Sequence, residues 1–447
     1  MSSTILHAKP EDISSSEKRG KYSAAIVGCG QAGILLAHQF AEAGFRVICT
    51  DPDPTIINLL TKGKAPFLNR ETETKLKEHA RAGRLNATTE AKVAIAQSDI
   101  VTITTPVKID RKKSTDYSDI ENTCKRVGAN LRGGTIVIVT SVVGVGTTEG
   151  IIKEILENTS GLKTGTDFGL AYWPVGHEQI ITATDKKTLD LVLTIAQAVL
   201  KIRVQRIESV RTAEATALFE AVRKETAIAL SNELAIFCEK AGIDYHKTTD
   251  MQETNADPPI TRLTLAEEDA AQSLYILFED AENLNTKLRI PTIATEVNEE
   301  TVKHAANLTK DALRNAGKTL KRAKISVLGI SQTPNEKGPP KKTAKQLAEA
   351  LEARGAKVSL YDPHFSEEEL NELGLTAKKS LNDALEGADC LIILTAHDQI
   401  KRVNLGKLRL AMKSPAAIVD LDVAFDPDKI EKEGLIYRGL GRGVWKK

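Results

Sequence analysis

The apolar positions of the N-terminal part of the chain fall into short runs that alternate with helical stretches. Residues 24–27 form one apolar run, residues 34–43 are typical of a helix that Gly44 ends, and residues 45–50 form a second run. Three later runs also predict strands: Ile100–Thr104, Gly134–Ser141 and Phe168–Tyr172. Strands that alternate with helices indicate a doubly wound parallel sheet. We therefore expect an α/β Rossmann dinucleotide-binding domain over residues 23–205.

The middle of the chain follows a helical pattern. Residues 212–241 contain no Gly or Pro and are rich in Ala, Glu and Leu, and residues 301–316 form a second helical run. These stretches predict an α-helical central domain over residues 206–322. Long helices between two α/β domains commonly pack against a twin, so we expect a homodimer through the central helices.

The strand–helix alternation returns in the last third of the chain. Strands are predicted at 325–330, 357–361, 390–395 and 416–420, with a helix at 343–353. This pattern indicates a smaller C-terminal Rossmann-like domain over residues 323–447. Residues 1–22 are mostly polar and are expected to be a disordered tail.

A glycine motif links the first predicted strand and helix. It reads Gly28-Cys29-Gly30-Gln31-Ala32-Gly33, and Asp51 follows the second strand eighteen positions after Gly33. This context indicates a site for a dinucleotide, with phosphates at the helix N-terminus and ribose hydroxyls on the acid, which favours NAD over NADP. The predicted cofactor-binding residues are Gly28, Gly30, Gln31, Ala32, Gly33, Asp51 and Thr105. The alternative is a vestigial Rossmann domain without a cofactor.

Composition narrows the classes of partner. The 447 residues include 61 basic and 60 acidic side chains, a balance that argues against nucleic acid and anionic membranes and favours small molecules or further copies of the chain. No apolar stretch approaches the roughly 20 residues of a membrane span, and no signal peptide is recognisable, so a cytoplasmic location is expected. Five scattered cysteines without metal-ligand spacing predict buried reduced thiols and no metal site.

Several segments, in order, resemble the UDP-glucose/GDP-mannose dehydrogenase family from Ala24 to Gly443. The segments in the first two predicted domains are Ala24-Ala-Ile-Val-Gly-Cys-Gly, Gly83-Arg-Leu-Asn-Ala-Thr-Thr, Gly146-Thr-Thr-Glu, Asp167-Phe-Gly-Leu-Ala-Tyr and Asn232-Glu-Leu-Ala-Ile-Phe-Cys-Glu-Lys-Ala-Gly-Ile-Asp. Those in the last domain are Val327-Leu-Gly, Arg354-Gly-Ala-Lys-Val-Ser-Leu-Tyr-Asp-Pro-His and Tyr437-Arg-Gly-Leu-Gly-Arg-Gly. The resemblance implies oxidation of a nucleotide sugar's primary alcohol to a carboxylate with two NAD, through a cysteine thiohemiacetal and thioester.

The residues that the resemblance assigns to this chemistry are replaced here. The family's threonine, glutamate, lysine and asparagine fall on Val142, Val175, Ala217 and Ala221. Its Gly-rich cysteine loop falls near residues 258–272. The chain has no glycine between Gly242 and Gly317 and no cysteine between Cys238 and Cys390.

The nucleotide-sugar site is also altered relative to the family. Pro340 stands at one family arginine, and the family's "DGRN" reads Asp420-Leu-Asp-Val, which places Asp422 at a second arginine. An acid there would repel a diphosphate. We therefore expect a family member that keeps the fold and the NAD site but has lost the parental reaction, and its catalytic residues are unassigned.

Two other functions remain open. One is a two-electron NAD-dependent oxidoreduction of a different substrate, for which Lys224, His177 and Glu178 are candidates beside their interpretation as surface or packing residues. The other is a non-catalytic regulatory or scaffolding subunit. A basic run formed by Lys337, Lys341 and Lys342 either binds phosphate or is a solvated loop, and His397 is expected to be structural.

Overall fold

The computed structural model describes residues 4–65, 70–110, 112–176, 180–202, 204–250, 268–338, 340–372, 374 and 376–443. The chain divides into two compact units. The first comprises Met1–Ala221 with Gln272–Lys287, and the second comprises Val222–Ala271 with Leu288–Lys447. None of the helices in these described ranges is both long and apolar enough to cross a membrane.

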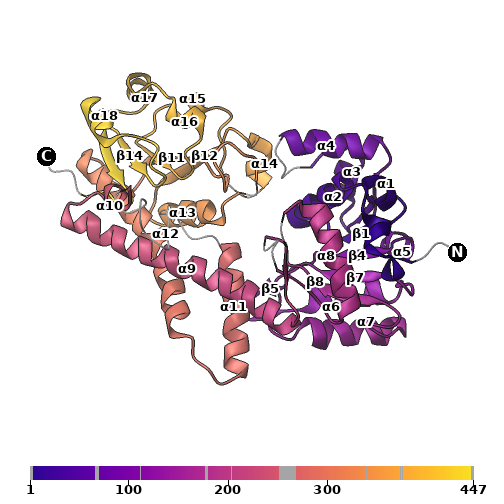
Figure 1. Cartoon of the computed structure of the whole chain (residues 1–447). Helices are drawn as coiled ribbons and strands as arrows, with labels where there is room; N and C mark the ends of the chain where they lie inside the picture. Colours follow the sequence, from indigo (N-terminus) through magenta and orange to yellow (C-terminus); the bar gives the residue numbers. More distant parts are fainter. Residues whose placement is uncertain are drawn as a thin grey trace. The chain divides into compact units, whose positions relative to one another are not determined.

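The first unit is built on an eight-stranded sheet in the order β10-β9-β8-β7-β4-β1-β2-β3. Figure 1 labels four of these strands, β1, β4, β7 and β8. The strands are β1 (Ser23–Val27), β2 (Arg46–Thr50), β3 (Leu85–Thr88), β4 (Ile100–Ile103), β7 (Ile136–Val139), β8 (Gly169–Tyr172), β9 (Ile180–Ala183) and β10 (Gln205–Arg206). All neighbours are parallel except β8 and β9. The central strands β1, β4 and β7 are buried along their whole length, as expected of a sheet covered on both faces.

Helices connect these strands. They are α2 (Gln31–Glu42), α3 (Pro54–Thr61), α4 (Arg70–Arg81), α5 (Ala91–Ala96), α6 (Ser118–Gly128), a short π-helical turn (Thr148–Ile152), α7 (Lys153–Ser160) and α8 (Lys186–Leu200). A small antiparallel ribbon of β5 (Lys108–Ile109) and β6 (Thr115–Asp116) precedes α6. The predicted doubly wound Rossmann domain is therefore present, with an antiparallel step near one edge of its sheet.

The N-terminal segment differs from the prediction of a disordered tail. Residues 5–7 and 10–13 form short 3₁₀ helices, α1 (Ser16–Arg19) follows them, and Ile5, Leu6 and Ile13 are at most 1% exposed in the core of the first unit. The prediction was wrong for residues 4–22 because these three isoleucine and leucine side chains supply enough apolar surface to hold a polar segment in place.

The second unit contains a five-stranded parallel sheet in the order β12-β11-β13-β14-β15. Its strands are β11 (Lys324–Leu328), β12 (Lys357–Tyr361), β13 (Cys390–Ile393), β14 (Ala417–Asp420) and β15 (Ile436–Gly439). Its helices are α10 (Tyr245–Asp250), α12 (Arg289–Asn315), α13 (Lys342–Glu352), α14 (Glu367–Glu372), α15 (Leu381–Leu385), α16 (Asp398–Lys401), α17 (Leu405–Ala411) and α18 (Pro427–Lys432). This is the predicted smaller Rossmann-like sheet.

The predicted long central helix is α9 (Val210–Ala241), and α12 begins twelve residues before the predicted second run, at Arg289. α11 (Glu268–Asn283) lies between them in the chain. Within the second unit, Asn298 of α12 donates from Nδ2 to the Glu225 carboxylate of α9 at 3.0 Å. The limits of the predicted central domain, residues 206 and 322, stay predictions.

Candidate functional site

The glycine motif forms a tight loop between β1 and α2. Gly28 has φ +103°, and a Cβ there would lie 2.6 Å from Thr104 Oγ1. A Cβ on Gly33 would lie 2.0 Å from the Gly28 carbonyl oxygen, so α2 can pack this closely only with glycine. A Cβ on Gly30 would meet nothing within 4 Å. Protein atoms fill the space beside Gly28 and Gly33, whereas the space beside Gly30 is open to a ligand.

Asp51 connects this loop to the end of β2. Its Oδ2 accepts a hydrogen bond from the Cys29 amide at 2.7 Å, and its Oδ1 accepts one from the Asp53 amide at 2.9 Å. Each carboxylate oxygen can accept a second hydrogen bond. The carboxylate is therefore fixed by the backbone and can still accept hydroxyl donors.

A cavity of about 440 Å³ opens at this carboxyl edge of the sheet. It is lined by Val27, Gly28, Gly30, Thr50, Asp51, Pro52, Thr89, Ala91, Thr104, Thr105, Pro106, Asp119, Asn122, Thr123 and Arg126. The open space at Gly30, the fixed acid and the free amides of the first turn of α2 suit the phosphates and ribose of a dinucleotide. When bound, NAD would supply hydride transfer.

Four of the seven predicted cofactor-binding residues line this cavity: Gly28, Gly30, Asp51 and Thr105. Gln31, Ala32 and Gly33 form the first turn of α2 beside it. Sequence reasoning missed the contribution of α6, whose residues Asp119, Asn122, Thr123 and Arg126 also line the cavity. Their spacing of three, four and seven residues was the available signal, because it places them on one helical face.

Acidic side chains hold the loop that follows β7. Glu214, fully buried on α9, accepts hydrogen bonds from the Gly146 and Thr148 amides at 2.6 and 2.8 Å. Asp280 of α11 accepts one from Val145 at 2.8 Å. Burial raises the pKa of both carboxyl groups, more than these amide donors lower it. The amides of this loop are thus used within the protein.

The four positions that the family assigns to catalysis form an apolar set in the first unit. Ala217 is fully buried and Ala221 is 9% exposed, whereas Val142 and Val175 are partly buried. Val175 packs against the core of the NAD-type domain. None of these side chains can donate a hydrogen bond or a proton. The predicted cysteine-loop region, residues 258–272, lies mostly outside the described residues, as do His177 and Glu178.

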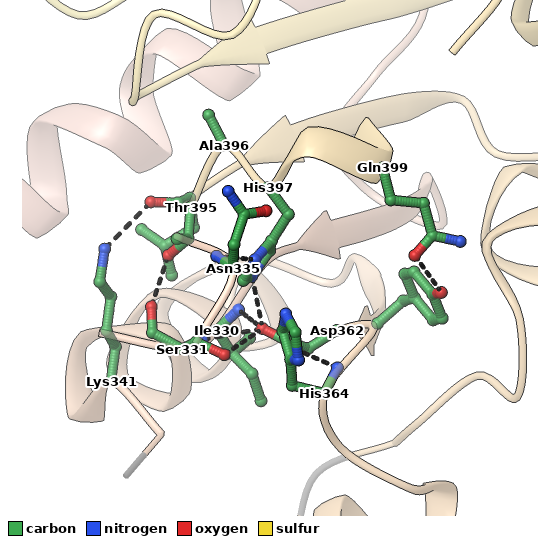
Figure 2. Close-up of polar contacts among 12 residues, drawn as sticks. Ile330, Ser331, Asn335, Lys341, Asp362, His364, Thr395, Ala396, His397 and Gln399 are labelled. Atoms are coloured by element: carbon green, nitrogen blue, oxygen red, sulfur yellow. Dashed lines mark hydrogen bonds and ion pairs between the residues drawn. The ribbon is translucent and has the colours of Figure 1, made fainter. Parts of the chain in front are cut away.

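In the second Rossmann-like sheet, Asp362 corresponds to Asp51, and groups of the protein itself form hydrogen bonds with its carboxylate (Figure 2). Asp362 Oδ2 accepts hydrogen bonds from the Ile330 and Ser331 amides at 2.7 and 2.8 Å and from His397 Nε2 at 3.0 Å. Burial acts to raise the pKa of Asp362, but His397 and the amide donors outweigh it and hold that pKa at about 2. His397 is buried and its Nδ1 accepts from the Asn335 amide, so its contacts are those of a structural residue. This carboxylate closes the loop after β11.

The altered nucleotide-sugar positions also have partners within the protein. Asp422 accepts a hydrogen bond from the Ala396 amide at 2.7 Å, and Pro340 forms an isolated bridge with Ser331. Lys337 is paired with Glu369 at 2.6 Å, and the buried Lys341 donates to the Leu394 carbonyl at 3.2 Å. The basic run is therefore not a fully solvated loop. Lys337 and Lys341 already have partners within the protein, so the three lysines are not all free to bind a phosphate. The five cysteines are all buried and free.

Comparison with known proteins connects both Rossmann-like sheets to one family. The NAD-binding domain of the UDP-glucose/GDP-mannose dehydrogenase family matches residues 22–193, and the UDP-binding domain of that family matches residues 327–427. The UDP-N-acetyl-D-mannosamine dehydrogenase of Pyrococcus horikoshii is 26% identical over 94% of this chain and 99% of its own. The UDP-glucose 6-dehydrogenase of Rhizobium meliloti is 26% identical over 93% of this chain and 99% of its own length.

A solved structure agrees with these matches over nearly the whole length. The UDP-D-ManNAc dehydrogenase of Pyrococcus horikoshii has a TM-score of 0.81 at 25% identity and covers 94% of this chain and 99% of its own. The matched sequences, the common fold and the cavity at the glycine loop all support the same family assignment. The chain belongs to the UDP-glucose/GDP-mannose dehydrogenase family, and NAD is its cofactor.

Proposed function

We propose that this protein binds NAD but no longer carries out the four-electron oxidation of a nucleotide sugar. One observation carries the proposal: the four family positions for threonine, glutamate, lysine and asparagine hold Val142, Val175, Ala217 and Ala221, of which both alanines are buried. Loss of a single oxyanion donor typically slows an enzyme by about 10² to 10³. Two such donors are replaced here by alanine methyl groups.

The missing nucleophile supports the same proposal. The family's thiohemiacetal and thioester require a thiolate, and the chain has no cysteine between Cys238 and Cys390. Of the five cysteines, Cys29, Cys49, Cys124 and Cys390 are fully buried, and Cys238 is 8% exposed. Burial raises the pKa of the Cys124 thiol to about 12, and it also raises the pKa of Cys390. A buried thiol of this kind is a poor nucleophile.

Changes in the C-terminal domain extend the proposal to substrate binding. Where the resemblance places an arginine, Asp422 supplies a carboxylate that is held by the Ala396 amide. A guanidinium binds a diphosphate through paired hydrogen bonds, whereas a carboxylate repels it. We therefore propose weak or absent affinity for the nucleotide sugars that the named relatives oxidise.

A turnover assay tests this proposal. Protein saturated with NAD is mixed with UDP-N-acetyl-D-mannosamine, UDP-glucose or GDP-mannose, and NADH fluorescence is recorded, with the Pyrococcus horikoshii relative as the active control. We expect no NADH above the buffer rate for this chain. Formation of two NADH per sugar would refute the proposal.

The same NADH readout, repeated with a panel of other alcohols, separates the two open alternatives. A two-electron oxidoreductase would form one NADH per molecule of a different alcohol, and a non-catalytic subunit would form none with any substrate. Lys224 is exposed on α9. An NAD site combined with apolar residues at the family's catalytic positions favours the non-catalytic subunit. A cytoplasmic location is also part of the proposal.

We also propose a homodimer through α9. Leu230, Leu234 and Phe237 are 57%, 41% and 63% exposed. Their spacing of four and seven residues places them on one face of the helix. A contiguous apolar stripe on the surface of a helix is typical of a protein interface, and a twofold pair of such helices would cover it.

A further inference from the structure

The lining of the NAD cavity includes the guanidinium group of Arg126, which the glycine motif does not predict. Arg126 lies on α6, one helical turn after Asn122, and both line the same cavity as Asp51. Asp51 marks the adenosine end of the site, because the acid after the second strand of a Rossmann unit binds the ribose of adenosine. A cavity lined by both Asp51 and α6 is therefore the adenosine end of the cofactor site.

Hydrogen bonds hold Arg126 at this cavity. Its Nη2 donates to Thr123 Oγ1 at 3.1 Å, and Thr123 Oγ1 lies 2.9 Å from Thr105 Oγ1. Thr123 is 1% exposed, so the anchor is fixed inside the protein, whereas Arg126 itself is exposed. Thr105 also lines the cavity. The guanidinium is thus connected through two hydroxyl groups to the loop after β4.

The charges around the cavity leave Arg126 available to a ligand. The other charged residue of α6 that lines the cavity, Asp119, is paired with Lys108. Among the described residues no carboxylate forms an ion pair with Arg126. A planar guanidinium without a carboxylate partner can stack on an aromatic ring, a contact that Arg makes more often than Lys.

We propose that Arg126 contacts the adenine ring of NAD and that Thr123 positions it. This inference rests on the NAD site, and it assigns the adenosine-end specificity of that site to α6. Asp51 selects the ribose, and Arg126 adds affinity for the aromatic base.

Calorimetric titrations of the full-length protein with NAD and with AMP test the proposal. R126A is expected to weaken both ligands by the same factor, about 3- to 30-fold, because a cation–π contact of ordinary strength would be lost. Lys125 is exposed, carries the same charge and does not line the cavity, so K125A reports the effect of charge alone. R126K is expected to give an intermediate loss, since the ammonium keeps the charge but not the plane.

The positioning role of Thr123 has its own readout. T123V is expected to weaken NAD and AMP by a smaller common factor and to have no further effect when combined with R126A. A further loss in that background would show that Thr123 acts through Thr105 instead. Affinities that fall no more in R126A than in K125A, or that fall for NAD and not for AMP, would overturn the role of Arg126. Absence of NAD binding by the wild type would contradict the cofactor assignment itself.

Discussion

At the residue scale, Asp51 performs two tasks in the cofactor site. It accepts the Cys29 amide of the glycine loop and keeps acceptor capacity for hydroxyl groups. Removing it would loosen the loop and delete the proposed acceptor for the ribose hydroxyl groups. The hydrogen bonds that would be lost are charge-assisted, because their acceptor is a carboxylate.

We predict that D51A lowers the affinity for NAD about 10- to 100-fold, because one or two hydrogen bonds to a charged acceptor are lost. Isothermal titration calorimetry measures the change. Asp53 provides a matched control, since its side chain caps α3 by accepting the Thr55 amide. D53A should lower the free energy of unfolding by about 1 kcal/mol and leave NAD affinity unchanged. Equal NAD affinity in D51A and wild type would contradict the assigned role.

Val423 shows a residue-scale strain. It has φ +52°, a left-handed conformation that a β-branched side chain rarely adopts, and it is 42% exposed. It stands where the family's "DGRN" has asparagine, which tolerates that conformation. The surrounding loop is fixed by Asp420, which accepts the Ala424 and Phe425 amides at 3.0 and 2.9 Å.

We predict that V423N raises the free energy of unfolding by about 1 kcal/mol, because the strain of a β-branched residue in this region is relieved. Urea denaturation measures the gain. Val93 is an exposed valine inside α5, and V93N should bring no such gain because a helical backbone does not strain valine. If V423N is no more stable than V93N, Val423 is not strained.

At the element scale, the sequence predicted the strands and helices that glycines or long apolar runs delimit. β1, α2 and β2 lie within three residues of their predicted limits because Gly28 and Gly44 end the preceding elements. β3 and β10 were missed because exposed or partly exposed residues form most of these short strands. α6 was missed as part of the site because its polar residues, read from the sequence alone, resemble the solvated face of a helix.

A cluster of two histidines and a glutamate joins α2 and α4. His38 and Glu42 of α2 face His79 of α4, whose Nε2 lies 3.1 Å from Glu42 Oε2. Burial, and then the neighbouring His79, Lys75 and Lys201, lower the pKa of His38, although Glu42 opposes them. Nδ1 of His38 has no hydrogen-bond partner in the described part of the chain. The folded protein therefore favours neutral His38.

This cluster predicts how stability depends on pH. Since the folded pKa of His38 lies below its unfolded value of about 6.5, the unfolded chain binds the proton first and stability falls as pH drops through that value. H38Q should make the fall between pH 7.5 and pH 5.5 shallower, as measured by thermal unfolding. His7 is exposed, so H7Q serves as the control. An unchanged slope in H38Q would exclude this source of pH dependence.

At the scale of the whole molecule, the proposed dimer rests on the apolar stripe of α9. We predict that F237D converts dimers into monomers, because each protomer would lose about 1.5 to 3 kcal/mol of apolar burial and place a charge in the interface. Light scattering after size exclusion reports the mass. Leu410 on α17 is 79% exposed and gives the control L410D, which should remain dimeric. A dimeric F237D would place the interface elsewhere.

The central claim is that this family member keeps its cofactor site and has lost its nucleotide-sugar reaction. The most direct measurement is calorimetric titration with NAD, followed by titration of the NAD-loaded protein with UDP-glucose, UDP-N-acetyl-D-mannosamine and GDP-mannose. We predict saturable heat for NAD and none for the three nucleotide sugars. Saturable binding of a nucleotide sugar to the loaded protein, or no heat with NAD, would contradict it.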